Sequence, residues 1–151
     1  KAGKPLGNSF QTELEKRGLQ GLALAGKVEM EIAQLDESDR AAFLKDIGIE
    51  EPARDRFIRL TYALMSLISF FTTGEDEVRA WTITRGTNAR KAAGKIHSDI
   101  ERGFIRAEVV AYDEFIAYGS EAKCKEAGKL RLEGKDYVVN DGDIIHFRFA
   151  V

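Results

Sequence analysis

The sequence has little cysteine and no long apolar run. Cys124 is the only cysteine, so the chain can form neither an intramolecular disulfide nor a cysteine-based metal site, and this usage suits a reducing cytoplasm. No apolar stretch reaches the roughly 18 residues of a membrane span, and no signal-peptide pattern is present. We therefore expect a cytoplasmic protein without a membrane partner. The first residue is Lys1 rather than methionine, which suggests a piece of a longer chain.

The sequence also lacks the net positive charge that is typical of a general nucleic-acid binder. Lysine and arginine number 23, and aspartate and glutamate 25, so the net charge is −2. The average conceals a local excess, because residues 79–106 contain seven basic side chains against Asp99 and Glu101, a balance of +5. Residues 1–51 and 107–128 each carry −3. A basic surface is therefore expected only within 79–106.

Groups for catalysis or metal binding are scarce. The two histidines, His97 and His146, lie far apart in the sequence, and neither has metal-ligand spacing with a carboxylate. No nucleophile, base and orienting group can be combined into a catalytic set. We predict no catalytic residue and no metal site in this chain.

Two Gly-Lys pairs, at 26–27 and 94–95, have part of the pattern of a phosphate-binding loop. Such a loop needs a glycine, four residues and then Gly-Lys-Ser/Thr, between a strand and a helix. Val28 and Ile96 stand where the hydroxyl that reaches Mg²⁺ is required, and Gly94 falls inside a predicted helix. Neither pair is therefore expected to hold a phosphate.

The first third of the chain is predicted to be mostly helical. The candidates are a polar helix at 8–17, a short buried strand at 19–26, and helices at 27–35, 37–48 and 52–67. Asp36 is placed to cap the helix that follows it, and Pro52 suits the first turn of the last one. The apolar set expected to bury that last helix is Phe57, Ile58, Ala63, Leu64, Leu67 and Ile68.

From Ser69 onward the pattern changes to strands around one helix. "SFFTT" and "VRAWTIT" predict a β-hairpin, and a helix capped by Thr87 or Asn88 follows and ends at Gly103. Further strands are expected in "FIRAEVV", "KLRLEG", "KDYVVND" and "IIHFRF", with a short turn capped by Asp113 after the first of these. Strands, one helix and more strands predict an α+β fold, a β-grasp (ubiquitin-like) sheet packed on one helix.

The basic excess falls on and around that helix. Lys91, Lys95 and Arg102 share the face that points away from the alanines. RNA phosphates can contact such a face without burying a lysine, but a simple solvated face explains the same composition. His97 is expected to be partly buried with a local hydrogen bond, or alternatively to contact RNA. The candidates for an RNA interface are Arg85, Arg90, Lys91, Lys95, His97, Arg102 and Arg106.

The motifs also resemble a known family. "FFTTGEDEVRAWTITRGTNARKAAGKIHSDIERGFIRAEVVAYDEFI", followed by "AGKLRLEGKDYVVNDGDIIHFRF", closely resembles the C-terminal part of the YchF proteins, the Obg-like ATPases. The similarity runs from about residue 20 to the end of the chain. It implies three regions: 1–35, the end of an α/β P-loop nucleotide-binding domain; 36–68, a helical connection; and 69–151, a TGS domain with the β-grasp fold.

The resemblance implies nucleotide chemistry outside these residues. Ala25, Gly26 and Lys27 are similar to the family's base-contacting loop, with alanine in place of its usual serine. The family's phosphate loop, Mg²⁺-binding residues and Asn-x-x-Glu motif have no counterpart in the sequence. ATP or GTP, with Mg²⁺, is therefore expected to bind in the parent protein, an ATPase/GTPase, and not in this fragment.

The resemblance further implies association with the ribosome. On this interpretation the TGS domain docks on the ribosome or on structured RNA, and the parent's own nucleotide-binding domain is a second partner. Two alternatives remain open: the TGS domain is a protein–protein or intramolecular module that gates the ATPase, or it is a small guanine-nucleotide sensor. An exposed sheet edge or aromatic patch favours the gating module.

Overall fold

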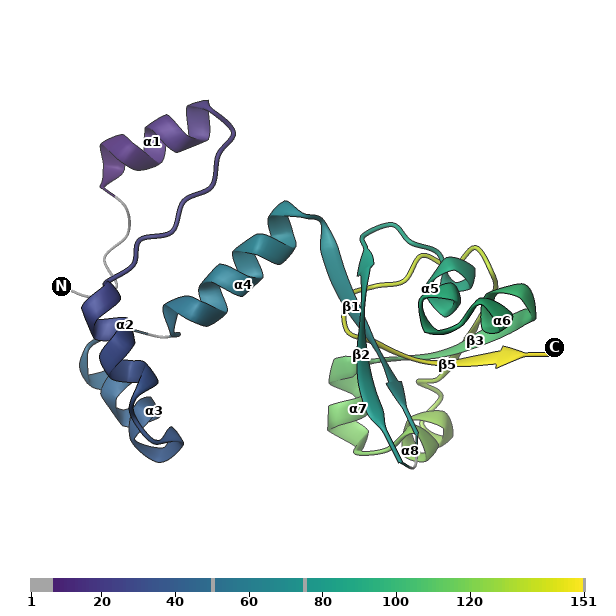
Figure 1. Ribbon diagram of the computed structural model, residues 1–151. Coiled ribbons are helices and arrows are strands. Elements are labelled where there is room, and N and C mark those ends of the chain that lie inside the picture. The colour runs from purple at the N-terminus through teal and green to yellow at the C-terminus, as the bar shows by residue number, and fades with distance from the viewer. Residues whose placement is uncertain (1–6, 50, 75, 151) are drawn as a thin grey trace. The chain divides into compact units, whose positions relative to one another are not determined.

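The chain divides into a helical unit and a sheet-based unit. The computed structural model describes residues 7–49, 51–74 and 76–150, and the two compact units are Lys1–Leu64 and Met65–Val151 (Figure 1). The helices of the first unit are α1 (Asn8–Lys16), α2 (Gly26–Ala33), α3 (Glu37–Asp46) and α4 (Ala53–Leu64). The strands of the second are β1 (Leu67–Thr73), β2 (Val78–Thr84), β3 (Phe104–Ala111), β4 (Arg131–Glu133) and β5 (Asp143–Phe149). Its helices are α5 (Ala89–Ile96), α6 (Ser98–Arg102), α7 (Tyr112–Tyr118) and α8 (Glu121–Glu126). No helix in the described ranges is long and apolar enough to cross a membrane.

Helices α2 and α3 form a small core of their own. The buried side chains are Ile32, Leu44 and Ile49, with Val28, Phe43 and Ile47 packed around them. Asp36 occupies the N-cap position of α3, as predicted, although its side chain makes no capping hydrogen bond. Gly48 follows α3 with φ of +70°, a left-handed conformation that suits glycine.

The segment 19–25, predicted as most of a buried strand, has no regular structure. A strand needs a neighbouring strand to satisfy its backbone groups, and the described part of the first unit contains no other strand. Arg56 holds the segment to α4 instead, because its Nη2 donates to the Ala23 carbonyl at 2.7 Å. The strand prediction was therefore wrong, since apolar content alone does not provide a pairing partner.

Helix α4 is shorter and more exposed than predicted. It ends at Leu64, and Ser66, with φ of +52°, redirects the backbone so that Leu67 and Ile68 begin strand β1. Three of the apolar side chains expected to be buried are instead exposed: Ile58 at 49%, Phe57 at 58% and Leu64 at 58%, whereas Ile68 is buried, as predicted, in the core of the second unit. An amphipathic pattern predicts that a face can be buried, but burial also requires a neighbouring surface.

The second unit has the predicted β-grasp architecture. Its strands follow the order β2-β1-β5-β3-β4. Strands β1 and β2 form the expected antiparallel hairpin, β1 runs parallel to β5, and β3 is antiparallel to both β5 and β4. The first and last strands of the unit thus lie side by side at the centre of the sheet. The α+β, ubiquitin-like prediction is confirmed.

Helix α5 packs on one face of this sheet through small side chains. Ala89, Ala92 and Ala93 are fully buried, which lets the helix backbone lie close to the strands. The strand residues of the same core are Ile68, Phe70, Ile83, Ala107, Val109, Ile145 and Phe147. Phe70 and Phe147 meet edge to face, with ring centroids 5.9 Å apart.

The helical region differs locally from its prediction. The helix expected to continue to Gly103 breaks at His97, whose extended backbone (φ −160°) ends α5 and begins α6. Helix α7 starts after Ala111, so the predicted cap, Asp113, lies inside its first turn instead. Helix α8 was not predicted, although Ser120 caps it through a hydrogen bond from Lys123 N.

A buried carboxylate holds the loop before β5. Asp143 is only 2% exposed, and its Oδ2 accepts hydrogen bonds from Tyr137 Oη at 2.7 Å and Asn140 N at 2.8 Å. Burial raises the pKa of the Tyr137 hydroxyl most, and the hydrogen bond to Asp143 raises it further. These side-chain bonds replace a strand ladder, so the strand predicted at 135–141 was wrong and only the isolated bridge Asn88–Val138 forms there.

Candidate functional site

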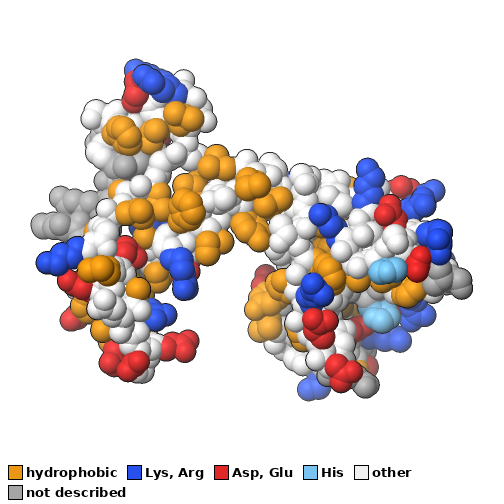
Figure 2. Space-filling view, viewed as in Figure 1, with side chains coloured by type: hydrophobic (Ala, Val, Ile, Leu, Met, Phe, Trp, Pro, Cys, Tyr) orange, Lys and Arg blue, Asp and Glu red, His pale blue; other side chains and the backbone are white. Residues whose placement is uncertain are grey.

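The basic residues of α5 face solvent because the cap and the alanines fix the orientation of the helix. Asn88 Oδ1 accepts a hydrogen bond from Lys91 N at 3.0 Å, so Asn88 is the N-cap. With the alanine face turned to the sheet, the basic positions of the helix are exposed: Arg90, Lys91 and Lys95. Figure 2 shows blue side chains interspersed with red ones on the α5–α6 side of this unit.

Gly94 is explained by packing inside the second unit. A Cβ atom at this position would lie 2.9 Å from Glu101 Cδ and 3.3 Å from Glu101 Cβ. The absence of a side chain therefore leaves room beside α5 for the Glu101 side chain of α6. The glycine of this Gly-Lys pair serves the contact between two helices.

Acidic groups of α6 neutralise part of the basic surface. Arg102 pairs with Asp99 at 2.8 Å, and both side chains are largely exposed. Arg90 Nε donates to the backbone carbonyl of Glu101 at 3.2 Å, which restrains the Arg90 side chain but leaves its charge unbalanced. Exposed ion pairs such as Arg102–Asp99 are weak, so a phosphate can compete for the arginine.

Two lysines carry free positive charge on α5. The side chains of Lys91 and Lys95 make no hydrogen bond or ion pair with any described residue. They are four residues apart on one helix and therefore neighbours on its surface. Arg85, just after β2, is likewise exposed and unpaired within the described ranges.

His97 is more exposed than predicted. Its side chain is 63% exposed, so the expected partial burial was wrong. The expected local hydrogen bond is present, because Nδ1 accepts from Asp99 N at 3.2 Å and caps α6. The Asp99 Oδ2 atom lies 3.6 Å from the same nitrogen. The ring is thus held at the α5–α6 junction, with its other nitrogen free for contact.

Arg106 lies on the other face of the sheet. Ala107 belongs to the core beneath α5, and neighbouring side chains of a strand point to opposite faces. Arg106 is paired in register with Arg148, whose guanidinium contacts Glu108 at 2.6 Å. The structure therefore separates Arg106 from the cations of α5, although the sequence places it close behind the helix.

The loop that resembles a base-contacting element begins α2. Ala25 is the N-cap residue, and Gly26 and Lys27 form the first turn. The Glu29 carboxylate, two residues further along α2, accepts a hydrogen bond from Ala53 N at 2.9 Å, at the start of α4. Glu29 thus caps α4, whose N-terminus favours a negative group.

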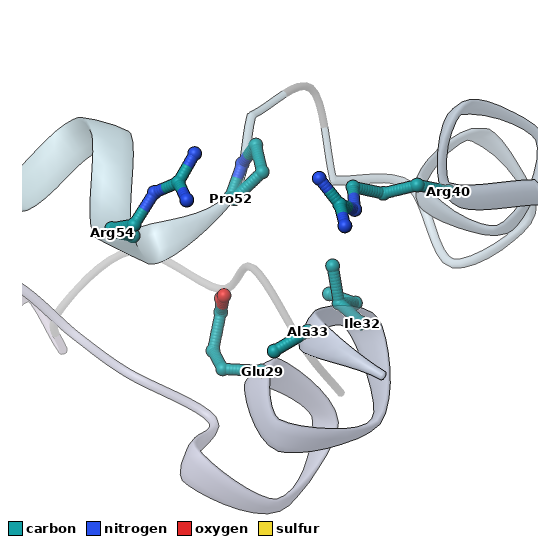
Figure 3. Close-up of a pocket in the computed structure, with 6 residues that line it drawn as sticks. All are labelled: Glu29, Ile32, Ala33, Arg40, Pro52 and Arg54. Atoms are coloured by element: carbon teal, nitrogen blue, oxygen red, sulfur yellow. The ribbon is translucent and has the colours of Figure 1, made fainter. Parts of the chain in front are cut away.

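A small cavity lies beside this contact. Figure 3 shows Glu29 pointing toward the beginning of α4, with Pro52 and Arg40 at the sides of the cavity. Its volume is about 110 Å³, below the roughly 300–1,000 Å³ of small-molecule sites. Within the described ranges, no three His, Cys, Asp or Glu side chains gather to hold a metal ion.

An aromatic groove in the second unit was missed by the sequence analysis. It has a volume of about 500 Å³ and is lined by Ser69, Phe71, Ala111, Tyr112, Asp113, Asp141 and Gly142. We call it the Phe71–Tyr112 groove. The adjacent phenylalanines of β1 were the available signal, because alternation buries Phe70 and must turn Phe71 to the opposite face.

Comparison with known proteins identifies relatives over most of the chain. Residues 67–150 match the family YchF-GTPase_C, described as "Protein of unknown function (DUF933)". The chain is 56% identical over 137 residues to the Ribosome-binding ATPase YchF of Pasteurella multocida (strain Pm70), covering 91% of this chain and 38% of that protein. It is 54% identical over 130 residues to the protein of the same name from Bacillus subtilis (strain 168), covering 86% and 36%.

The structure has related folds among solved proteins. Its TM-score to the Schizosaccharomyces pombe YchF GTPase is 0.81 at 32% identity, covering 93% of this chain and 37% of that one. A GTP binding protein from Pyrococcus horikoshii OT3 shares the fold, with a TM-score of 0.59 at 18% identity over 94% of this chain and 41% of that one. The chain spans well under half the length of these relatives. From sequence and fold together, the chain belongs to the YchF family and carries its C-terminal domain.

Proposed function

We propose that this chain is the C-terminal part of a ribosome-binding ATPase, and that its β-grasp unit is a TGS domain that docks the protein on the ribosome or on structured RNA. The names of the bacterial relatives support the ribosome as partner. On this proposal residues 1–35 close the nucleotide-binding domain, 36–68 connect the domains, and 69–151 form the TGS domain. ATP or GTP, with Mg²⁺, is bound and hydrolysed by the rest of the protein.

The free charge on α5 carries the docking proposal. Lys91 and Lys95 are exposed and adjacent, and they are unpaired within the described part of the chain. Such lysines can neutralise phosphates without losing an internal partner, and the release of counterions then favours binding. The exposed face of α5 has no aromatic side chain, which favours contact with the RNA backbone over base stacking.

The remaining candidates differ in how freely their charge is available to a phosphate. Arg85 and Arg90 are expected to contribute next, since neither is neutralised by a carboxylate among the described residues. Arg102 must first leave Asp99, and Arg106 cannot contact the same phosphates as α5 because it projects from the opposite face of the sheet. His97 is accessible and can contact RNA through the ring nitrogen that does not cap α6.

Charge reversal tests this proposal. The full chain with Lys91→Glu and Lys95→Glu is expected to bind ribosomes at least about tenfold more weakly in co-sedimentation. The slope of log affinity against log salt should decrease in magnitude by about 2, one phosphate contact for each lysine. Lys123→Glu with Lys125→Glu, on the exposed face of α8, is the matched control because it makes the same change in net charge on the same unit. Equal losses in the two double variants, or an unchanged slope, would contradict docking through α5.

A protein-binding role that gates the ATPase is the second candidate. Strand β2 lies at the edge of the sheet, and its seven residues pair with β1 in unbroken register without a proline or a bulge. Such an edge can receive an extended peptide. Binding to the rest of a YchF protein that is insensitive to salt and to the lysine reversals would favour this role.

A further inference from the structure

The Phe71–Tyr112 groove lies apart from the α5 cations. Phe70 points into the core beneath α5, so Phe71 projects from the opposite face of the sheet. The Tyr112 ring stands beside it, with ring centroids 6.0 Å apart and an interplanar angle of 37°. Two aromatic rings therefore form an accessible wall on a face that the RNA contact does not use.

The groove is held in shape by the turn before β5. Asp141 Oδ1 accepts a hydrogen bond from Ser69 N at 2.8 Å, and Gly142 N donates to Ser69 O at 2.8 Å. Gly142 has φ of +83°, and a Cβ atom there would lie 3.4 Å from Tyr112 Cβ. The turn thus ties β1 to the start of α7 and orders the groove before any ligand arrives.

The charge of the groove is negative. Asp113 and Asp141 both line it and are exposed, and no lysine or arginine lies among its lining residues. Asp113 has no hydrogen-bond or ion-pair partner within the described ranges. Aromatic faces attract cations, and free carboxylates pair with them, whereas RNA phosphates would be repelled. No third His, Cys, Asp or Glu side chain joins these two as a possible metal ligand in the described part of the chain.

We propose that the Phe71–Tyr112 groove binds an arginine side chain from a basic segment of a partner protein. The planar guanidinium can stack on the Tyr112 ring and at the same time donate to Asp113, a combination that the compact ammonium of lysine achieves less well. On α7, one turn from Tyr112, Ile116 is 61% exposed and is a neighbour of Tyr112 on the helix surface. The neighbouring apolar surface gives the residues that flank the arginine something to pack against.

This site is independent of the Lys91–Lys95 contact. The lysines meet phosphates on the helix side of the sheet, and the groove meets a basic polypeptide on the other side. A protein with both surfaces can contact RNA and a basic protein in one assembly. Failure of either interaction leaves the other intact, so each test has its own outcome.

The test measures binding of a blocked pentapeptide, Gly-Ser-Arg-Ser-Gly, to the full chain by NMR of the backbone amides. A second peptide has lysine in place of the arginine. The arginine peptide is expected to shift the amide signals of Ser69, Tyr112 and Gly142, and the lysine peptide to bind about threefold more weakly. A peptide with citrulline, which is planar but uncharged, should cause no shifts there. Asp113→Asn is expected to weaken arginine-peptide binding about fivefold.

Asp136→Asn is the matched control, since Asp136 is also exposed and without a described partner but lies in the turn after β4. The Asp136→Asn variant should bind the arginine peptide as tightly as the unchanged chain does. The proposal is overturned if these amides do not shift at about 5 mM arginine peptide, a concentration that reveals even millimolar affinity. Equal shifts with the citrulline peptide, equal losses in both aspartate variants, or equally tight binding of spermine would overturn it as well, because each shows that no arginine side chain is selected.

Discussion

Gly103→Ala is expected to destabilise the β-grasp unit strongly. Gly103 ends α6, and its carbonyl accepts a hydrogen bond from Ala150 N at 3.0 Å. A Cβ atom at Gly103 would lie 2.8 Å from the carbonyl carbon of Ala150 and 3.2 Å from its nitrogen. Non-bonded carbons prefer about 3.5–4.0 Å, and since the atoms of Ala150 are backbone, no change of rotamer can relieve the overlap. The end of β5 must therefore move away from α6.

The magnitude follows from three terms. Overpacking costs about 1–3 kcal/mol, and loss of the Ala150–Gly103 hydrogen bond costs about 0.5–1.5 kcal/mol. The lower entropy of alanine in the unfolded chain offsets about 0.4–1 kcal/mol. We expect the free energy of unfolding to decrease by about 2–3 kcal/mol, which corresponds to a fall in Tm of roughly 8–24 °C for a unit of this size.

Trp81 provides the assay. It is the only tryptophan in the sequence, and its indole N–H donates to Thr72 Oγ1 at 3.0 Å inside the β-grasp unit. Its fluorescence during urea and thermal unfolding therefore reports on this unit. Gly134→Ala is the control, because a Cβ atom at Gly134 meets no described atom within 4 Å and its φ is not positive. Unfolding free energies of the two variants that agree within about 0.5 kcal/mol would refute the steric argument.

Two further predictions concern the α5 cap and the loop before β5. Asn88→Ala should lower the free energy of unfolding by about 1 kcal/mol because Lys91 N loses its acceptor, whereas Asn88→Asp should retain most of it; equal urea midpoints for the two variants would exclude the cap as the cause. The raised pKa of Tyr137 means that the folded protein holds the hydroxyl proton more tightly than the unfolded chain does. Stability linked to this group is present below about pH 10 and is lost as pH rises through the folded pKa, so Tyr137→Phe should make the alkaline decline in the urea midpoint shallower than in the unchanged chain.

The parts of the fold that were predictable from the sequence are those specified locally. The β1–β2 hairpin is formed by two β-rich runs around a short acidic turn, and α5 combines a capping Asn88 with an alanine stripe. Each of these signals acts within a few residues, and the long-range pairing of β1 with β5 then follows from the β-grasp arrangement. The orientation of Lys91 and Lys95 was predictable for the same reason, because the alanines determine which face is buried.

Several failures involve partners that the local pattern does not specify. The 19–25 segment is apolar but has no strand beside it in the described part of its unit, and Phe57, Ile58 and Leu64 of α4 remain exposed. Residues 135–141 look like a strand, yet the buried Asp143 engages Tyr137 and Asn140 and bends the chain into a loop. The Phe71–Tyr112 groove likewise joins three segments that are distant in sequence, so no single motif indicates it.

The central position of β5 also constrains the order of folding. This strand lies between β1 and β3, yet it follows every other strand in the chain. While the polypeptide is being synthesised from its N-terminus, β1 and β3 therefore emerge first, each with an unpaired edge that can associate with another chain. The hairpin and α5 can form early from local contacts, but the sheet closes only when its last strand is released. The β-grasp unit is thus completed only after its own last strand has been synthesised.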